Sequence, residues 1–503
     1  MPDGLWGWVG PLAVTVLAGI LRFWQLGLPH AIVFDETYYA KDALGLVTFG
    51  VEHEMVEKAN KLLINGNTDI WTGSGSFVVH PPAGKWPIGL GELIFGATPF
   101  GWRFAAAMFG TLSVLILART ARRMTRSTLL GCLAGLLLAL DGLHFVQSRI
   151  ALLDIFLMFW VVAAFACIVA DRDWMRTRLA DKAEGITVRG FGPGIGVRPW
   201  LILAGVCLGL ACATKWNGIY FMAAFGLLTF FWDAGARRAV GSPHWFGTAL
   251  LRDSWPSFIW IVVVGFVVYV LSWTGWFVTD IGAFRHWAAN NIDGLANLGF
   301  LTPVADALLS LWHYHVEIYT FHVGLSEGHD YQSAPWEWLL LLRPVAYYYE
   351  DPASGEMGCQ VAQCSREILA QGNPAIWWAA LPALVAMVLL YLRQRDWRAG
   401  AVTAAMAFGW LPWVYFSIAD DRTMFFFYAL PLLPFLVLAL TMAAGMIIGP
   451  ADAGSPRRLA GSAIVGAYAL LVIVAFAYFY PVWSAEVIPY DAWHARMWLS
   501  SWI

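Results

Sequence analysis

Charged residues are scarce in this chain. Only 13% of its 503 residues are Asp, Glu, Lys or Arg, whereas 59% are hydrophobic and 29 are Trp. A soluble domain has about 25% charged and about 45–50% apolar residues. The composition therefore excludes an ordinary soluble globular protein and predicts an all-α polytopic membrane protein. We expect membrane lipids around it and no nucleic-acid partner.

Recognisable processing signals and repeats are also missing. The first apolar segment, residues 6–26, has no basic start and no small-residue cleavage site, so we interpret it as a membrane span and not as a signal peptide. We find no fixed-period repeat along the chain. This absence argues against a transporter, in which related halves and broken mid-membrane helices are expected.

Long apolar segments predict eleven transmembrane helices, since a helix needs about 20 apolar residues to cross a bilayer. The fifth and sixth segments are short and meet at Lys215. The predicted spans are residues 6–26, 99–118, 128–147, 150–170, 200–214, 216–232, 257–277, 375–392, 400–418, 424–448 and 461–481.

The basic residues predict the orientation of the chain, because short cytoplasmic loops collect Lys and Arg. More than half of the 31 basic residues fall in one set of alternate loops. We therefore expect a plasma-membrane protein with a cytoplasmic amino terminus and an extracytoplasmic carboxyl terminus. The basic loops are residues 119–126, 172–198, 237–252, 393–398 and 457–458.

Two predicted external loops are too long to be plain connectors, which run about 2–8 residues. They are residues 27–98 and 278–374, and they divide the chain into 1–26, 27–98, 99–277, 278–374, 375–481 and an external tail, 482–503. The first loop is predicted to carry amphipathic helices that lie in the membrane interface, starting near Glu36 and near residue 84. A solvated cap is the alternative for this loop.

The six cysteines fall into two groups. Cys359 and Cys364 lie five residues apart in the second external loop, where an oxidising compartment favours a disulfide over two free thiols. No further Cys pair or H-x-x-x-H run lies nearby, so no metal site is predicted. The other four lie in apolar spans, where they are expected to be small core residues: Cys132, Cys167, Cys207 and Cys212.

Adjacent carboxylates, Asp35 and Glu36, follow the first span, and the motif H-P-P-A-G-K-W begins at His80. Further charges lie at span mouths on the same predicted level. An ionised side chain at the bilayer centre costs at least about 2.5–3.5 kcal/mol, so these charges indicate function or pairing; Arg149 and Asp154 could also pair only with each other. The charges are Arg103, Arg149, Asp154, Lys215, Asp420, Asp421 and Arg422.

Carboxylates beside cations at one membrane surface are typical of a site that moves a proton and holds an anion, with phosphate the obvious anion. Arg103 and Arg422 are the favoured phosphate ligands because they lie at the bilayer mouth. The full set of candidates is Lys85, Arg103, Arg149, Lys215 and Arg422.

A run of histidines begins the second long loop. It has the spacing i, i+2, i+9 and i+16, which places no pair one helical turn apart, so substrate contact or supporting hydrogen bonds are expected in place of metal binding. The run comprises His313, His315, His322 and His329.

The order of motifs resembles the protein O-mannosyltransferases. They are D-E after the first span, H-P-P-x-G-K, S-R-x-x-L-L-D, T-K-W-N-G, H-x-H with a later H-x-Y, S-A-P-W-E-W and Y-x-L-P-L-L-P. The resemblance implies a GT-C glycosyltransferase fold and transfer of mannose from a polyprenyl-phosphate donor to Ser or Thr of secreted proteins. The loop 278–374 is too short for the β-trefoil insertion of eukaryotic members, so the chain looks like a bacterial, actinobacterial-type member with a decaprenyl-type donor.

The resemblance also implies residue roles. Asp35 would be the catalytic base, Glu36 would position the acceptor or support Asp35, and Asp154 would orient an Arg or the acceptor. Residues expected to contact sugar or acceptor, or to support those that do, are His80, His313, His315, His329 and Trp336.

Trp336 could instead be an interfacial anchor. No cofactor is required by this reading, and dependence on a divalent cation stays open. Expected partners are polyprenyl-phosphate-mannose and unfolded Ser/Thr-rich secretory polypeptides, with the secretion translocon as a further candidate. The rival functions are another polyprenyl-phosphate-sugar transferase acting on a lipid or glycan, a transporter, and a structural scaffold.

Overall fold

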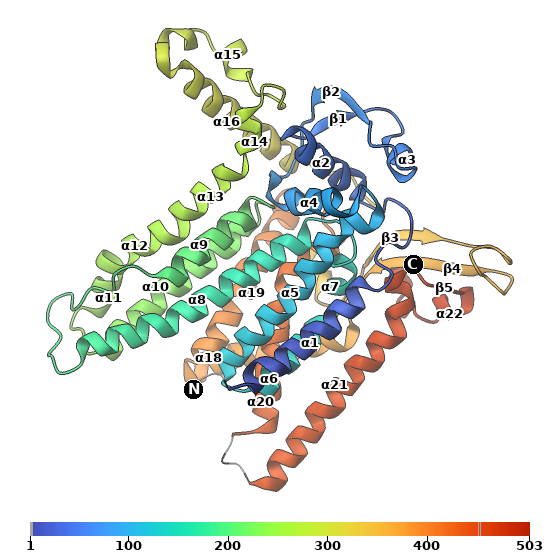
Figure 1. Cartoon of the computed structure of the whole chain (residues 1–503). Coiled ribbons are helices and arrows are strands. Elements are labelled where there is room, and N and C mark those ends of the chain that lie inside the picture. The colour runs from blue at the N-terminus through green and yellow to red at the C-terminus, as the bar shows by residue number, and fades with distance from the viewer. Residues whose placement is uncertain (1–3, 451, 453) are drawn as a thin grey trace.

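A computed structural model describes residues 4–450, 452 and 454–503, and helices dominate it (Figure 1). Within the described residues, nine helices are long and apolar enough to cross a membrane by length and composition. Helical backbone is expected here because hydrocarbon offers no hydrogen-bond partners to free N–H and C=O groups. The nine helices are Pro99–Thr125, Asp154–Ala183, Gly218–Ala239, Trp245–Ser272, Leu295–Gly324, Pro374–Gln394, Trp397–Ala419, Phe426–Ile448 and Ser455–Ser484.

Each of the eleven predicted spans coincides with an apolar helix, eight of them among these nine. The other three are shorter: α1 (Trp6–Phe23), α6 (Thr128–Ala139) and α9 (Pro199–Cys212). The remaining long helix, Leu295–Gly324, lies inside the predicted second external loop. It contains α16 (Thr302–Gly324), which projects beside one end of the bundle at a steep angle to the neighbouring helices (Figure 1).

Local sequence signals set several helix starts. Proline, which needs no hydrogen-bond partner at the first helical position, begins α5 (Pro99–Thr125), α9 and α18 (Pro374–Gln394). The Thr98 hydroxyl accepts a bond from the Gly101 N–H and thereby caps α5, as hydroxyl side chains commonly do. These starts place the ends of long apolar segments at fixed residues.

Two helices form the centre of the bundle. The apolar windows of α8 (Asp154–Ala183) and of η5 with α20 (Phe426–Leu432, Leu433–Ile448) are 83% and 78% buried. The corresponding value for α21 (Ser455–Ser484), at one edge of the bundle in Figure 1, is 17%. Most of the surface of α21 therefore faces the surroundings, which for an apolar helix of this length means lipid.

Further helices pack around this centre, and the segment Trp245–Ser272 lies at the other edge in Figure 1, with only 17% of its apolar window buried. These further helices are α7 (Gly142–Gln147), α10 (Gly218–Ala239), α11 (Trp245–Thr248), the π-helices η2 (Ala249–Asp253) and η3 (Ile259–Val263), α12 (Ser254–Phe258), α13 (Val264–Ser272), α14 (Thr274–Val278) and α19 (Trp397–Ala419).

The first long loop folds into a cap over one end of the bundle (Figure 1). Helix α2 packs on α4 so closely that a Cβ at Gly89 would lie 2.5 Å from the Ala43 carbonyl oxygen. The cap consists of α2 (Glu36–Phe49), β1 (His53–Met55), α3 (Ala59–Ile64), β2 (Trp71–Gly75), η1 (Pro82–Gly84) and α4 (Lys85–Phe95), with β1 and β2 antiparallel.

An interfacial helix needs an exposed apolar face, which α4 has and α2 lacks, so the interfacial position stays a prediction for α4 and does not fit α2. Leu93 and Ile94 of α4 are exposed apolar side chains. Helix α2 is buried almost continuously from Tyr39 to Leu46, because α4 covers it on one side. The cap is therefore a packed part of the fold.

The second long loop contributes a small antiparallel sheet in the strand order β3-β4-β5. Strands β3 (Val345–Glu350) and β4 (Cys364–Ala370) form a hairpin, and β5 (Val487–Pro489) adds a strand from the carboxyl-terminal tail. The rest of the loop and tail forms α15 (Trp287–Asn291), η4 (Leu295–Leu301), α16, α17 (Pro335–Trp338), α22 (Tyr490–His494) and η6 (Ser500–Trp502).

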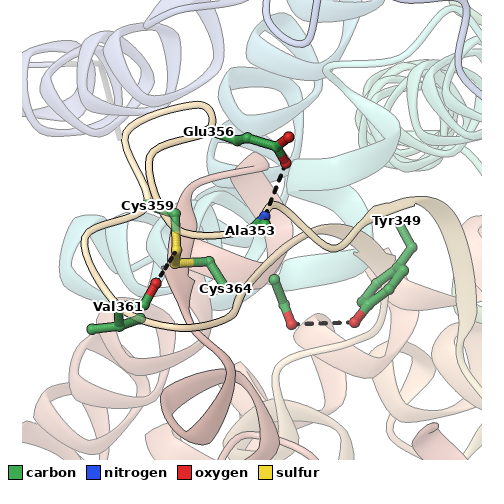
Figure 2. Close-up of a disulfide and its surroundings, with 7 residues drawn as sticks. Tyr349, Ala353, Glu356, Cys359, Val361 and Cys364 are labelled. Carbon is green, nitrogen blue, oxygen red and sulfur yellow. Dashed lines mark hydrogen bonds between the residues drawn. A yellow bond between two sulfur atoms is a disulfide. The ribbon is translucent and has the colours of Figure 1, made fainter.

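A disulfide joins Cys359 and Cys364 at the tip of the hairpin, with a Cα–Cα distance of 5.9 Å. Figure 2 shows it beside the Ala353 N–H, which donates a hydrogen bond to the Glu356 carboxylate at 3.0 Å. The disulfide thus closes the last part of the connection between β3 and β4, residues 359–364. At the other end of the hairpin, the Tyr347 ring stacks on Phe34 at 4.5 Å, and the second loop thereby supports the residue next to Asp35.

Candidate active site

Asp35 and Glu36 have different roles because their side chains have different surroundings. Glu36 is fully buried. Its carboxylate accepts two bonds from Arg103, at 2.7 and 2.8 Å, and one each from the backbone N–H groups of Val33 and Ala151. Glu36 therefore anchors the turn that presents Asp35, and it supports Asp35 without direct contact with a substrate.

Arg103, one of the two favoured phosphate ligands, does not have that role. All five of its N–H groups are used: three bonds go to the carbonyls of Leu26, Pro29 and Ala31, and two go to Glu36. The side chain is fully buried. Arg103 binds the end of the first span to the start of α2, and the phosphate assignment was wrong.

Arg149 is likewise a structural residue. Its guanidinium donates to the carbonyls of residues 21, 22, 24 and 25, at 2.6–3.3 Å, just where α1 ends. A helix carboxyl end has unsatisfied carbonyls and a partial negative charge, which Arg149 satisfies. It does not pair with Asp154, whose carboxylate binds Lys215 instead.

Lys85 is buried and forms ion pairs with Glu52 at 2.8 Å and Asp42 at 3.3 Å. Two carboxylates more than neutralise one ammonium group, so Lys85 is not available to an anion. It links α4, α2 and the start of β1 inside the cap.

Lys215 and Arg422, the other two candidates, line one cavity of about 540 Å³. Lys215 forms an ion pair at 2.8 Å with Asp154, the first residue of α8, and lies 5.5 Å from the centre of the Tyr428 ring. The second oxygen of Asp154, Oδ1, is buried without a hydrogen-bond partner among the described residues.

Arg422 lies in the turn between α19 and η5. Its guanidinium is 5.6 Å from the centre of the Trp413 ring, and Nη2 is 3.3 Å from Nδ1 of His322. Among the residues that the structure describes, no carboxylate lies within ion-pair distance of it. Arg422 therefore forms no ion pair with the described residues at the cavity, although Asp420 also lines it.

The cavity has a polar end and an apolar end. His80, Asp154, Lys215, His322 and Arg422 lie at the polar end, below the cap. The apolar end opens between α10 and the continuous segment η3–α13, and side chains from both sides line it: Ile219, Met222, Val262 and Phe266. Such a cavity suits a ligand with a charged head and a long apolar tail.

Asp35 lies beside the polar end. Burial raises the pKa of its carboxyl from 3.8 to about 6, with the nearby ammonium of Lys215 lowering this pKa and Asp154 raising it. The carboxylate accepts no hydrogen bond from the described residues, so its lone pairs are free. A carboxylate that is ionised near neutral pH and has a raised pKa suits a general base.

The histidines of the run have different surroundings, although three of them lie on α16. His315 and His322 line the cavity, together with His80 from the first loop. His313 instead stacks on Trp287 at 3.8 Å, and His329 contacts Phe425. Neither lines the cavity, so substrate contact by His313 and His329 has no support in its lining, and the alternative of a supporting role stays a prediction.

Trp336, also proposed to contact sugar, is 50% exposed and does not line the cavity. The aromatic side chains that do so were missed, and they include Trp216, Tyr220, Tyr269, Trp413 and Tyr428. Some of them adjoin motifs, for example Trp216 in T-K-W-N-G, and this was the only sequence signal for them.

Within the described part of the chain, no group of three or more His, Cys, Asp or Glu residues could hold a metal ion. The chemistry available from these residues is thus a buried base, two cations and several ring and imidazole groups around a cavity that opens toward the apolar surface.

Comparisons with known proteins agree across the whole chain. The family model described as "Dolichyl-phosphate-mannose-protein mannosyltransferase" matches residues 12–286, and the model described as "C-terminal four TMM region of protein-O-mannosyltransferase" matches residues 307–502. The polyprenol-phosphate-mannose–protein mannosyltransferase of Mycolicibacterium smegmatis (strain MKD8) is 39% identical over 99% of this chain and 94% of its own. The protein of the same name from Corynebacterium glutamicum is 34% identical over 97% and 92%.

Solved structures agree in fold. The Saccharomyces cerevisiae Pmt1-Pmt2 complex bound to the sugar donor superposes with a TM-score of 0.75, at 15% identity, over 100% of this chain and 93% of that one. An archaeal oligosaccharyltransferase from Archaeoglobus fulgidus gives a TM-score of 0.52, at 13% identity, over 98% and 58%. The architecture is therefore the GT-C glycosyltransferase fold, and the chain belongs to the dolichyl-phosphate-mannose–protein mannosyltransferase family.

Proposed function

We propose that this protein transfers mannose from a polyprenyl-phosphate-mannose to Ser or Thr hydroxyls of protein acceptors. Full-length identity of 34–39% to proteins named for this reaction carries the proposal. The cavity supports it, because a cationic end below the cap and an apolar end between two membrane helices match a lipid-linked phosphosugar.

The reaction needs one displacement. Asp35 takes the proton of the acceptor hydroxyl as its oxygen forms a bond to the anomeric carbon of mannose. The bond between that carbon and the phosphate oxygen breaks, and polyprenyl phosphate leaves with the electron pair. A single base is enough for this inverting course, and no covalent enzyme intermediate forms.

The leaving phosphate has a low pKa, so it needs charge stabilisation more than a proton. Arg422 supplies a cation that no carboxylate neutralises, and Lys215 supplies a donor held in place by Asp154. Arginine binds phosphate through a planar fork, and lysine binds it as a point charge. These two residues are the proposed ligands of the donor phosphate, and the apolar surface of α10 and α13 accommodates the polyprenyl chain.

The site is proposed to face the extracytoplasmic side of the plasma membrane, with the amino terminus in the cytoplasm. The distribution of Lys and Arg supports this orientation. So does the Cys359–Cys364 disulfide, since such bonds persist in oxidising compartments. The start of α1 and the strand β5 lie at opposite ends of the bundle (Figure 1), in keeping with an odd number of crossings.

The acceptors are proposed to be extended Ser/Thr-rich secretory polypeptides that arrive unfolded from the translocon. A buried base at the membrane surface supports this, because a side chain must reach below the cap to meet Asp35. The proposal fails if folded proteins are mannosylated as quickly as their extended peptides.

The test is transfer of radiolabelled mannose from polyprenyl-phosphate-mannose by the purified protein, with a Ser/Thr-rich peptide as acceptor. Its control is the same peptide with every Ser and Thr replaced by Ala. Label on the hydroxyl-containing peptide alone supports the proposed reaction. Label on a lipid or glycan acceptor, with none on the peptide, overturns the acceptor class and favours the rival GT-C transferase.

A further inference from the structure

His322 of α16 connects three separate segments at the polar end of the cavity. Its Nε2 lies 3.0 Å from the carbonyl oxygen of Val79. A carbonyl can only accept a hydrogen bond, so Nε2 carries the proton and donates it. In the neutral ring Nδ1 is then an acceptor, and it receives the N–H of Arg422 Nη2 at 3.3 Å.

This bond matters because Arg422 has few other restraints. Its Nε is buried without a hydrogen-bond partner among the described residues, and its guanidinium lies 5.6 Å from the centre of the Trp413 ring. A long flexible side chain loses much conformational entropy when it is fixed. Its orientation toward the cavity therefore depends on His322 and Trp413.

Among the described residues, Arg422, which is half-buried, is held without a carboxylate, as is the buried Arg22, whose Nη2 lies 2.6 Å from Nδ1 of His144. Other buried arginines are held differently. Carboxylates bind Arg103, Arg198 and Arg237 and neutralise them. A neutral imidazole orients a guanidinium by a hydrogen bond and leaves its charge in place. For a residue that must bind an anion, this distinction decides whether charge is available.

We propose that His322 is a positioning residue that orients Arg422 toward the donor phosphate without neutralising it. This inference rests on the proposed function, and it assigns a role to a histidine that acts on the phosphate only through Arg422. Since Val79 directly precedes His80, the same ring also ties the first loop to the turn that carries Arg422.

A variant at position 322 is expected to fold, because the backbone next to Arg422 is held independently. The Thr423 N–H donates to the Leu325 carbonyl at 3.1 Å, and the Thr423 hydroxyl donates to the Glu327 carbonyl. Met424 in turn accepts the N–H of Ser333 at 2.9 Å. Loss of the imidazole therefore releases the Arg422 side chain and leaves its turn in place.

The experiment measures binding of decaprenyl phosphate to the purified full chain in lipid nanodiscs, together with its inhibition constant against mannose transfer. His322→Ala is expected to weaken both about ten-fold. His322→Asn, which keeps an acceptor for Arg422, should recover most of the loss. His313→Ala is the matched control, on the same helix but stacked on Trp287 outside the cavity, and should bind as the wild type does.

A double variant separates positioning from a merely structural effect. If His322 acts through Arg422, then His322→Ala adds little to the loss already caused by Arg422→Ala. Both measured constants are independent of the fraction of active protein. Independent, multiplicative losses, or wild-type binding by His322→Ala, would overturn the inference. Failure of the wild-type protein to bind decaprenyl phosphate would instead overturn the proposed donor, and the inference with it.

Discussion

At the scale of single residues, the two cations of the cavity offer an anion different amounts of charge. Lys215 lies 2.8 Å from an Asp154 oxygen, so the pair has little net charge and acts as a directed donor. Arg422 meets an imidazole and an aromatic ring instead. Arg422 is therefore the cation of the polar end that forms no ion pair with a described carboxylate, and a donor phosphate would pair with it.

The raised pKa of Asp35 predicts the pH dependence of catalysis. Burial shifts this pKa from 3.8 to about 6, and only the ionised carboxylate can accept a proton. The value of kcat/KM should therefore be constant above about pH 7 and fall roughly ten-fold per pH unit below the pKa. Initial rates between pH 4.5 and 8.5 check this, with His313→Ala as a control of unchanged profile. A fall in kcat/KM centred near pH 4, or no fall at all, would contradict the assignment of Asp35 as the base.

The charged residues show how far sequence reasoning reached at this scale. Placement on the predicted spans correctly put Lys85, Arg103, Arg149 and Lys215 near one end of the bundle. It could not reveal their partners, because these contacts form only in the tertiary fold. Glu52 and Asp42 form ion pairs with Lys85, and carbonyls before Asp35 accept hydrogen bonds from Arg103. A shared depth in the membrane is thus weaker evidence for a common functional site than a shared place in the lining of one cavity.

At the scale of elements, the end of α1 depends on Arg149. Removal of this side chain in Arg149→Ala leaves several carbonyls without a partner, and each buried unsatisfied acceptor costs about 1–3 kcal/mol. We expect a loss of about 2–4 kcal/mol in the free energy of unfolding, seen as a lower midpoint of thermal unfolding in detergent.

Arg149→Lys should recover only part of this loss, since one ammonium cannot span four carbonyls. Binding of decaprenyl phosphate by the folded fraction should be unaffected in both variants. A stable Arg149→Ala protein that no longer binds the lipid phosphate would show that Arg149 is a ligand after all.

The elements themselves were predictable to different degrees. Apolar length alone located the helices of all eleven predicted spans. The same criterion does not distinguish α16 from a membrane span, because α16 is apolar over much of its length yet belongs to the second loop. Its burial depends on contacts with Trp273, Trp276 and the first loop. Helix α2 was judged interfacial for a related reason, because nothing in its sequence shows that α4 would cover it.

At the scale of the whole molecule, the proposed orientation makes the hairpin tip extracytoplasmic and the turn between α18 and α19 cytoplasmic. Ser354 and Gln394 are exposed residues at these two places. A membrane-impermeant maleimide should label Ser354→Cys in intact cells and Gln394→Cys only after permeabilisation. Wild-type protein, whose free cysteines lie in the apolar helices, sets the background. The reverse pattern would invert the topology and place the site in the cytoplasm.

The central claim is that Asp35 is the base of a mannosyl transfer to protein. The most direct measurement compares wild type with Asp35→Asn for transfer of labelled mannose from polyprenyl-phosphate-mannose to a Ser/Thr-rich peptide, with binding of the donor measured on the same preparations. The account predicts that Asp35→Asn abolishes transfer while it still binds the donor, because the amide cannot take the proton but leaves Lys215 and Arg422 in place. Wild-type turnover by Asp35→Asn would remove Asp35 from the mechanism and contradict the account.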